Sequence, residues 1–366
     1  MPKKSPTIKV LIAGNKGHVT ETEMIKGLIE NGVDVHAAFA SDSPQIAELQ
    51  RASVATRTLD LKSNIDPAGA RKIRRWIKDE GFNIVHGLAN RQVANLIWAS
   101  YGLPNKVIAY RGAIGHVSRW DPGCYLKWLN PRIDKIVCVS KAVERDLAAG
   151  GVRPDKLVTI YKGHDLDWYK DLDPVEARRA VNAEFDIPED AILVGMAANM
   201  RRVKGADLLM RALMALPDHV HGLFIGEVRD PLVHKLAADP SIKRRVHFAG
   251  YRNEASSLIG ALDINVAPSR GREGLTKSII EGMVQGVPPV VSDAGGLPEL
   301  VADESPSPVF PAENVGRLTA LIQQTIEREV GGDKLRPKRS RLPSRFLIGS
   351  TVTQTHELYT ELIKTI

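Results

Sequence analysis

Short apolar runs alternate with amphipathic segments along most of the chain. In the first half the apolar runs lie at 8–13, 34–39, 82–86, 106–110 and 134–140, and helical spacing of apolar positions fills 20–31, 67–80, 90–101 and 141–149. The runs are short, partly β-branched and bounded by Gly, Pro or polar residues, which is typical of strands. Alternating strands and helices predict a parallel sheet with helices on both faces.

The same pattern then starts again. Further apolar runs lie at 191–197, 220–226, 245–249, 262–268 and 287–291, with helix-like segments near 204–216, 229–237, 253–261 and 275–286. Two successive series predict two doubly wound α/β domains, with a ligand bound at the strand carboxyl ends in the cleft between them.

The predicted domain boundaries follow from this reset. The charged, Pro-punctuated segment 161–190 is typical of a linker. We therefore expect an N-terminal domain over 1–163, a C-terminal domain over 164–349, and an amphipathic C-terminal helix over 350–366 that packs back towards the N-terminal domain. A length of 366 residues suits two such domains.

Composition narrows the classes of protein. No apolar run approaches the roughly 18–20 residues that span a bilayer, and the N-terminus has no signal-peptide pattern. Cys124 and Cys138 provide no disulfide framework and no metal cluster, so we expect a cytoplasmic protein. The formal charge of +7 suits an anionic partner such as a nucleotide or a phospholipid surface, or it only aids solubility. We expect no nucleic acid.

Two carboxylates stand out in GREGLTKSIIEGMVQGVPPVV, residues 271–291. Glu273 lies in a glycine-flanked loop, and Glu281 lies inside an apolar run that predicts a helix beginning near residue 275. The free N–H groups at such a helix start bind anions. Carboxylates beside that site are poor ligands for a phosphate but good hydrogen-bond acceptors for sugar hydroxyls. The alternative is that Glu281 merely bonds an arginine or a buried backbone group.

This stretch continues into SDAGGLPELV and resembles the C-terminal signature of the retaining nucleotide-sugar glycosyltransferases of family 4, the glycogen synthase-like group. That signature has two glutamates separated by seven residues, a G-V-P-V-V strand and a G-G-x-x-E loop. Here they correspond to Glu273, Glu281, 286–290 and 295–299. The resemblance runs over nearly the whole chain and implies the GT-B fold.

The resemblance also implies residues that bind the donor. In GMAANMRRVKGADLLMRAL, Lys204 matches the family lysine that neutralises the donor diphosphate. The family arginine five positions earlier falls on Asn199, so Arg201 or Arg202 would replace it. The remaining candidates for the donor are Gly17 in the first loop, the nucleobase segment at Gly250, Tyr251 and Arg252, and the helix start at Gly274, Leu275 and Thr276.

In the N-terminal half the resemblance implies loops for the acceptor and the sugar. Gly14 and His18 lie in the first glycine-containing loop, and His86 lies in IVHGLANRQV, which resembles a second loop. The family histidine after the strand VIAY is replaced by Arg111, with His116 five residues later. Either residue could take its role.

The activity implied is retaining transfer of a hexose-type sugar, from a UDP-sugar rather than a GDP-sugar, to a glycan or glycolipid in bacterial lipopolysaccharide or surface polysaccharide synthesis. Lys204, a nearby arginine and the helix start would stabilise the departing diphosphate, Glu281 would bind the ribose, and Glu273 would orient the sugar. We expect no cofactor and no metal. Alternatives are a GT-B-shaped epimerase or phosphorylase, or a nucleotide-sugar-binding protein without activity.

Two further motifs need interpretation. Paired aspartates at 165–167 and 171–173 could hold a cation in other glycosyltransferases, but both fall in the predicted linker. The cluster SRWDPGCYLKWLNPR, with Trp120, Tyr125 and Trp128, suits reversible docking on an anionic membrane, or alternatively a small satellite core.

Overall fold

The computed structural model describes residues 7–330 and 340–366. The chain forms two compact units. Unit 1 contains the chain up to His164 together with Ser344–Ile366, and unit 2 is Asp165–Pro343. The expected boundary after residue 163 therefore lies one residue from the observed one, whereas residues 344–349, expected in the second domain, belong to unit 1.

Unit 1 is built on a parallel sheet with the strand order β3-β2-β1-β4-β5-β6-β7. Its strands are β1 (Lys9–Ala13), β2 (Asp34–Phe39), β3 (Ala55–Thr58), β4 (Ile84–Gly87), β5 (Lys106–Arg111), β6 (Lys135–Cys138) and β7 (Leu157–Thr159). All five predicted strands are present. The prediction missed β3 and β7, which are the two edge strands and carry exposed or half-buried side chains, so neither shows a continuous apolar run.

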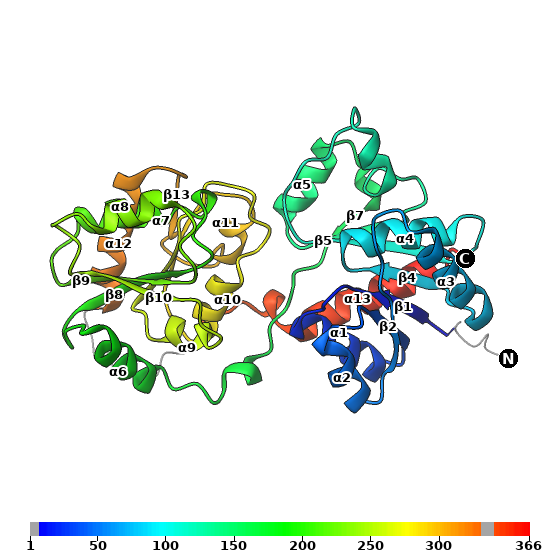
Figure 1. Cartoon of the computed structure of the whole chain (residues 1–366), viewed down its shortest axis with the longest axis horizontal. Coiled ribbons are helices and arrows are strands. Elements are labelled where there is room, and N and C mark those ends of the chain that lie inside the picture. The colour runs from blue at the N-terminus through cyan, green and yellow to red at the C-terminus, as the bar shows by residue number, and fades with distance from the viewer. Residues whose placement is uncertain (1–6, 331–339) are drawn as a thin grey trace. The chain divides into compact units, whose positions relative to one another are not determined.

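Helices cover both faces of this sheet (Figure 1). They are α1 (Val19–Glu30), α2 (Pro44–Arg51), α3 (Pro67–Glu80), α4 (Asn90–Ser100), α5 (Lys141–Ala149) and α13 (Ile348–Ile363). The C-terminal helix α13 packs against α1, where Leu358 and Tyr359 join the apolar side chains of β1 and β4. The end of the chain thus completes the core of the domain that its beginning forms.

Unit 2 contains a parallel sheet with the strand order β10-β9-β8-β11-β12-β13. Its strands are β8 (Ile192–Ala197), β9 (Val220–Ile225), β10 (Val246–Gly250), β11 (Ile264–Ala267), β12 (Pro289–Ser292) and β13 (Val309–Phe310). Its helices are α6 (Pro174–Phe185), α7 (Ala206–Met214), α8 (Pro231–Ala237), α9 (Ala255–Gly260), α10 (Lys277–Val284), α11 (Leu297–Leu300) and α12 (Val315–Thr325). The prediction of two doubly wound α/β domains is confirmed.

The prediction of a linker over 161–190 was wrong for much of its length. Helix α6 occupies its middle and packs against α9 through the buried side chain of Val181. The paired aspartates are helix caps: Asp165 accepts a hydrogen bond from the N–H of Asp167, and Asp173 caps α6. The charged residues that suggested a linker lie on the solvent face of α6 and at its N-cap.

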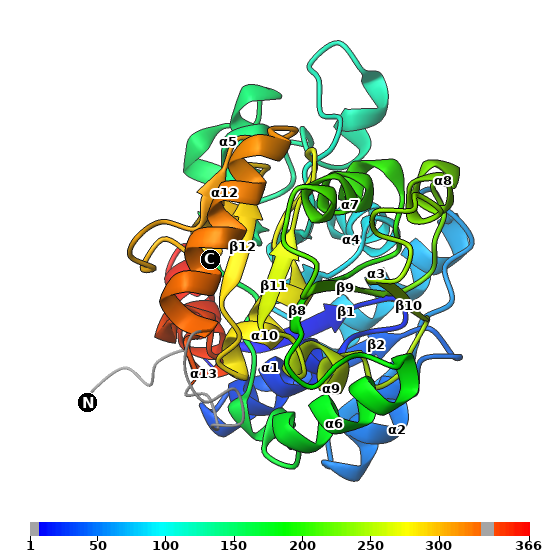
Figure 2. The same cartoon turned by 90° about the vertical axis from the view of Figure 1, so that its left-hand side faces the viewer.

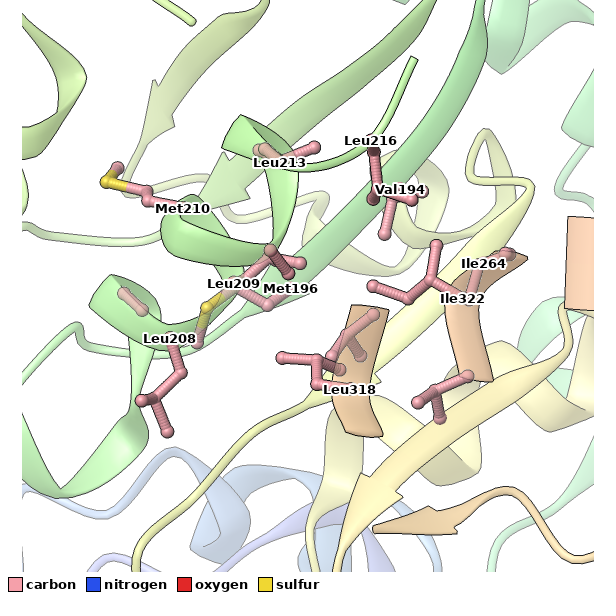
Figure 3. Packing of buried hydrophobic residues seen from close by; sticks show 14 of the residues in the cluster. Val194, Met196, Leu208, Leu209, Met210, Leu213, Leu216, Ile264, Leu318 and Ile322 are labelled. Atoms are coloured by element: carbon pink, nitrogen blue, oxygen red, sulfur yellow. The ribbon is translucent and has the colours of Figure 1, made fainter. Parts of the chain in front are cut away.

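The main core of unit 2 lies between its sheet and the helices α7 and α12, which pack against each other (Figure 2). Leu209 and Leu213 of α7 meet Leu318 and Ile322 of α12 above Val194 of β8, and all five side chains are buried (Figure 3). This packing holds the start of α7, so the loop that precedes it is presented from a rigid base.

Candidate functional site

Lys204 and Glu273 meet directly in unit 2. Glu273 is buried in the loop before α10, and its Oε1 lies 2.7 Å from Lys204 Nζ. The Ser269 hydroxyl donates to the same oxygen at 2.7 Å, and the Thr276 hydroxyl donates to Oε2 at 3.2 Å. Residues 69 positions apart, both selected from the sequence, therefore form one hydrogen-bonded cluster.

Two glycines make this approach of loops feasible. Gly205 has φ +72°, and a Cβ there would lie 1.9 Å from the carbonyl oxygen of Pro268. Gly295, in the G-G-x-x-E loop, has φ +57°, and a Cβ there would lie 2.2 Å from the carbonyl oxygen of Glu273. Both positions need glycine, because other residues strain in this conformation and their side chains would collide with backbone. The glycines thus bring two loops onto Glu273 and its neighbours.

The start of α10 has no capping side chain, although the Ile279 N–H donates to the Thr276 carbonyl at 3.2 Å. Helix α10 begins at Lys277, two residues later than predicted, and its N-cap Thr276 makes no side-chain capping bond. The Thr276 hydroxyl is instead turned to Glu273. The earliest N–H groups of a helix without a capping side chain can bind a ligand, and the helix dipole favours negative charge there. Gly274 and Leu275 form the loop that leads into this helix start.

Glu281 lies on the same helix and is buried. Its Oε1 accepts from the Ser256 hydroxyl at 2.6 Å and lies 3.0 Å from Lys277 Nζ, one turn earlier. Its partners are therefore a lysine and a hydroxyl rather than the arginine or backbone group considered as the alternative. The Lys277 side chain is 52% exposed, and Ser256 is half-buried.

Arginines organise the same loops, although the important one was not predicted. Arg270 donates two hydrogen bonds of 2.8 Å to the carboxylate of Asp207 and one of 2.7 Å to the carbonyl of Arg202. Burial opposes ionisation of Asp207, but the bonds from Arg270 outweigh it and lower the pKa of this carboxyl. Arg270 thus ties the loop after β11 to the start of α7. The sequence signal that could have identified Arg270 is its position three residues before Glu273.

The two arginines that were predicted lie at the rim. The Arg202 guanidinium is largely exposed, 3.9 Å from both Asp207 and Asp230. Arg201 is exposed as well. Neither forms an ion pair with Glu273 in the described part of the chain. Both remain candidates for an incoming phosphate rather than parts of the buried cluster.

The segment predicted to hold the nucleobase ends β10. Gly250 has φ +66°, and its carbonyl accepts from the N–H of Gly226 at 2.7 Å. Tyr251 is 71% exposed. The Arg252 side chain donates to the carbonyl of Ala249 and pairs with Glu184. The exposed tyrosine ring is therefore free to meet a flat ligand, while Arg252 is held by the protein.

In unit 1 the first loop is shaped by packing. A Cβ on Gly14 would lie 2.3 Å from the Phe39 ring, and Gly17 has φ +75°. The His18 imidazole caps α1 by accepting a 3.4 Å hydrogen bond from the N–H of Thr20. Gly14, Gly17 and His18 therefore determine the conformation of the first loop.

The assignment of His86 to a loop was wrong. His86 lies in strand β4 and is buried, and its Nδ1 is 2.7 Å from the Tyr359 hydroxyl on α13. Burial lowers the pKa of its imidazole to about 3, so the ring is neutral. Its Nε2 has no hydrogen-bond partner among the described residues. His86 lines a small cavity together with Thr20 and Tyr110.

Arg111 and His116 have different surroundings. Arg111 ends β5, and its guanidinium stacks on Trp128 at 4.7 Å from the ring centroid. Burial lowers the pKa of Arg111. The His116 side chain is 73% exposed, with Nε2 3.4 Å from Asp121 Oδ2. Trp128 is 4% exposed and Trp120 is 94% exposed. The prediction that both tryptophans face a membrane was therefore wrong for Trp128, which is part of the core.

Family models match both halves of the chain. The model described as Glycosyltransferase Family 4 matches residues 19–168, and that described as Glycosyl transferases group 1 matches residues 191–328. Together they cover most of the sequence. The chain belongs to glycosyltransferase family 4.

Two curated proteins similar to this family 4 chain are named for O-antigen and lipopolysaccharide core biosynthesis, and others are named D-inositol 3-phosphate glycosyltransferases. The O-antigen biosynthesis glycosyltransferase WclY of Escherichia coli is 29% identical over 163 residues, 44% of this chain and 43% of WclY. The lipopolysaccharide core biosynthesis mannosyltransferase LpcC of Rhizobium leguminosarum is 30% identical over 211 residues, 55% of this chain and 57% of LpcC. The alignments thus span about half the length of these relatives.

Solved structures confirm the GT-B fold. Anabaena HepE in complex with UDP superposes with a TM-score of 0.78 at 17% identity, covering 96% of this chain and all of HepE. In the described residues of this family 4 chain, no helix has the length and apolar character needed to cross a bilayer.

Proposed function

We propose that this family 4 glycosyltransferase transfers a hexose from a UDP-sugar to a glycan or glycolipid acceptor, with retention of configuration at the anomeric carbon. The observation that carries the proposal is the Lys204–Glu273 pair of 2.7 Å, placed in the same cluster as the N-cap of α10. A cation, an anion-binding helix start and hydroxyl-accepting carboxylates are what a diphosphate attached to a sugar requires.

The cluster suggests how binding could assist the reaction. Without a donor, the charge of Lys204 is balanced by Glu273. A diphosphate at the start of α10 would share this ammonium, and the charge that grows on the phosphate as the sugar–oxygen bond breaks would strengthen the interaction. Glu273, relieved of part of its ion pair, would accept from hydroxyls of the sugar. Ser269 and Thr276 would keep its carboxylate in place.

Glu281 is proposed to accept the ribose hydroxyls. Its present partners, the Ser256 hydroxyl and the Lys277 ammonium, both lie at Oε1, so the carboxylate is already oriented towards donors. Tyr251, exposed at the end of β10, is proposed to lie against the base. No metal is required in this scheme, because Lys204, the helix start and the rim arginines provide the positive charge.

The comparisons support the donor and acceptor classes. HepE has been solved with UDP and with UDP-glucose, which favours UDP over GDP. WclY and LpcC are named for O-antigen and lipopolysaccharide core synthesis, which favours a bacterial surface glycan as acceptor.

The test measures nucleotide release and product stereochemistry. The full chain is incubated with UDP-glucose, UDP-galactose or GDP-mannose and with lipopolysaccharide-core acceptors, and released nucleoside diphosphate is quantified. We expect acceptor-dependent release of UDP and a product whose anomeric configuration, read by NMR, matches that of the donor. Inversion would refute retention, and release of GDP alone would refute the choice of base. The variant Glu281→Gln is assayed in parallel. Glu189→Gln is its matched control, because Glu189 is an exposed carboxylate of unit 2.

The same assay separates the other activities. Conversion of the donor sugar without an acceptor would indicate an epimerase, and sugar phosphate formed from a glycan and inorganic phosphate would indicate a phosphorylase. Binding of UDP-glucose without turnover over the whole acceptor panel would indicate a binding protein.

We also propose reversible docking on anionic membrane through Trp120. Its indole is 94% exposed, and the neighbouring Arg119 is exposed too. A basic residue near such a surface contributes about 1 kcal/mol within a Debye length. Sedimentation with anionic vesicles should be lost at high salt and weakened in Trp120→Ala. Trp98→Ala, a half-exposed tryptophan of α4, is the control. Absence of binding at low salt would refute docking.

A further inference from the structure

Three chemically different ligand groups come together between β5 and β6. The Nε2 of His116, a carboxylate oxygen of Asp121 and the Sγ of Cys124 all lie within 4.8 Å of one another. Nε2 is 3.4 Å from Asp121 Oδ2, and Sγ is 3.6 Å from the same oxygen. We propose that these three side chains bind a zinc ion.

The spacing of the atoms matches a tetrahedral site. Zinc binds nitrogen, oxygen and thiolate sulfur at about 2.0–2.3 Å, so two ligands of one tetrahedral ion lie roughly 3.3–3.5 Å apart. The 3.4 Å separation between His116 and Asp121 lies within this range, the 3.6 Å separation between Asp121 and Cys124 exceeds it by about 0.1 Å, and Nε2 and Sγ lie within 4.8 Å of each other. Binding of an ion therefore needs at most a movement of the exposed His116 ring towards Cys124. The presence of only two cysteines in the sequence predicts no metal cluster, and the proposed site departs from that prediction because a histidine and an aspartate complete the set.

The carboxylate is held in position by the backbone. Asp121 caps the 3₁₀ helix Pro122–Leu126, and its Oδ1 accepts from the N–H of Gly123 at 2.8 Å. This bond leaves Oδ2 directed at the imidazole and the thiol. The Cys124 N–H donates to the Asp121 carbonyl at 3.0 Å, which fixes the cysteine within the same turn. Ligating carboxylates commonly have such a second hydrogen bond.

The donor set selects the class of metal. Thiolate and imidazole favour zinc and similar transition metals, whereas magnesium and calcium prefer oxygen ligands. On binding, the Cys124 S–H bond breaks, the sulfur bonds the metal and the proton passes to solvent. The protein supplies three ligands, so a water would complete the tetrahedron on the side where His116 is exposed.

Metal binding would order the segment that carries Trp120 and leads to Trp128. The three ligands lie within nine consecutive residues, so the ion closes a short local loop rather than joining distant elements. Trp128 is anchored under Arg111, which fixes the far end of the segment. The proposed site uses none of the donor-binding residues of unit 2.

Cobalt(II) provides a direct spectroscopic test, because it substitutes for zinc and a thiolate ligand produces a charge-transfer band. The reduced, EDTA-treated full chain is titrated with cobalt without oxygen. We expect a thiolate-to-cobalt band, visible bands of tetrahedral intensity, saturation at one equivalent, and loss of both signals on adding zinc. Zinc should also slow hydrogen exchange in residues 115–128.

Variants locate the site. Cys124→Ala should lose the band, and Asp121→Asn should lower cobalt affinity at least about 100-fold, beyond the 10–100-fold effect of an outer-shell partner. Cys138→Ala is the matched control, since this thiol is buried in β6 and should not contribute. The proposal is overturned if no charge-transfer band forms, if Cys124→Ala retains it, or if Cys138→Ala abolishes it. In those cases the contacts are only hydrogen bonds and an ion pair.

Discussion

Acidification should destabilise unit 1 through the single imidazole of His86. The ring is buried in β4 with Nδ1 bonded to Tyr359, and burial lowers the pKa to about 3. In the unfolded chain the imidazole has an ordinary pKa near 6.5. Between these two pKa values the imidazole binds a proton in the unfolded state but not in the folded state. Stability from the neutral ring is complete above pH 6.5 and is lost as the pH falls from 6.5 towards 3.

The size of the effect follows from these two values. Between pH 7 and pH 5 the unfolded imidazole goes from mostly neutral to mostly charged while the folded one stays neutral. One pH unit of this difference is worth about 1.4 kcal/mol, so the free energy of unfolding should fall by about 2 kcal/mol over this range. At pH 5 the result depends on the unfolded pKa and hardly on whether the folded value is 3 or 4.

Urea unfolding followed by tryptophan fluorescence can isolate this contribution. Four of the five tryptophans belong to unit 1, namely Trp76, Trp98, Trp120 and Trp128. Other titrating groups are shared by wild type and variant, so their effects cancel in the difference. We expect wild type to lose about 2 kcal/mol more than His86→Gln between pH 7 and pH 5.

A control separates burial from the hydrogen bond. Tyr359→Phe removes the hydroxyl but leaves the imidazole buried, so it should lower stability at both pH values while keeping the wild-type pH dependence. If His86→Gln loses as much stability on acidification as wild type does, the buried neutral imidazole does not set this dependence and the reasoning is refuted.

Four further outcomes test the donor site. Lys204→Met should lower turnover by about 10²–10³-fold because it removes a charge that stabilises the leaving diphosphate, and near-normal kcat would exclude this role. Glu281→Gln should weaken UDP binding by about 1–3 kcal/mol in calorimetry, and unchanged affinity with an intact fold would remove it from the ribose site. Gly205→Ala should lower the free energy of unfolding of unit 2 by about 2–3 kcal/mol, since its Cβ would meet the Pro268 carbonyl, and a wild-type urea midpoint would contradict the observed turn. UDP affinity should be the same in EDTA as with Mg²⁺ or Mn²⁺, so a requirement for either ion would refute metal-free donor binding.

The local pattern of the sequence was sufficient for the architecture. The ten predicted strands are present because buried parallel strands need continuous apolar runs, a signal that each run carries by itself. The edge strands β3, β7 and β13 and the capped helix α6 were missed because they bury less apolar surface. Sequence spacing also drew attention to Glu273 and Glu281, and the family resemblance added Lys204.

The side-chain contacts of the site could not be predicted, because they form between loops that are far apart in the sequence. Nothing near Lys204 in the chain indicates that Glu273 lies 2.7 Å away, because that contact depends on how the loop before α7 and the loop before α10 converge at the end of one sheet. The same holds for burial: Trp120 and Trp128 look alike in sequence, yet one is in solvent and the other lies under Arg111. Periodicity is a property of neighbouring residues, whereas side-chain partners depend on where the folded chain returns, which only the tertiary structure determines.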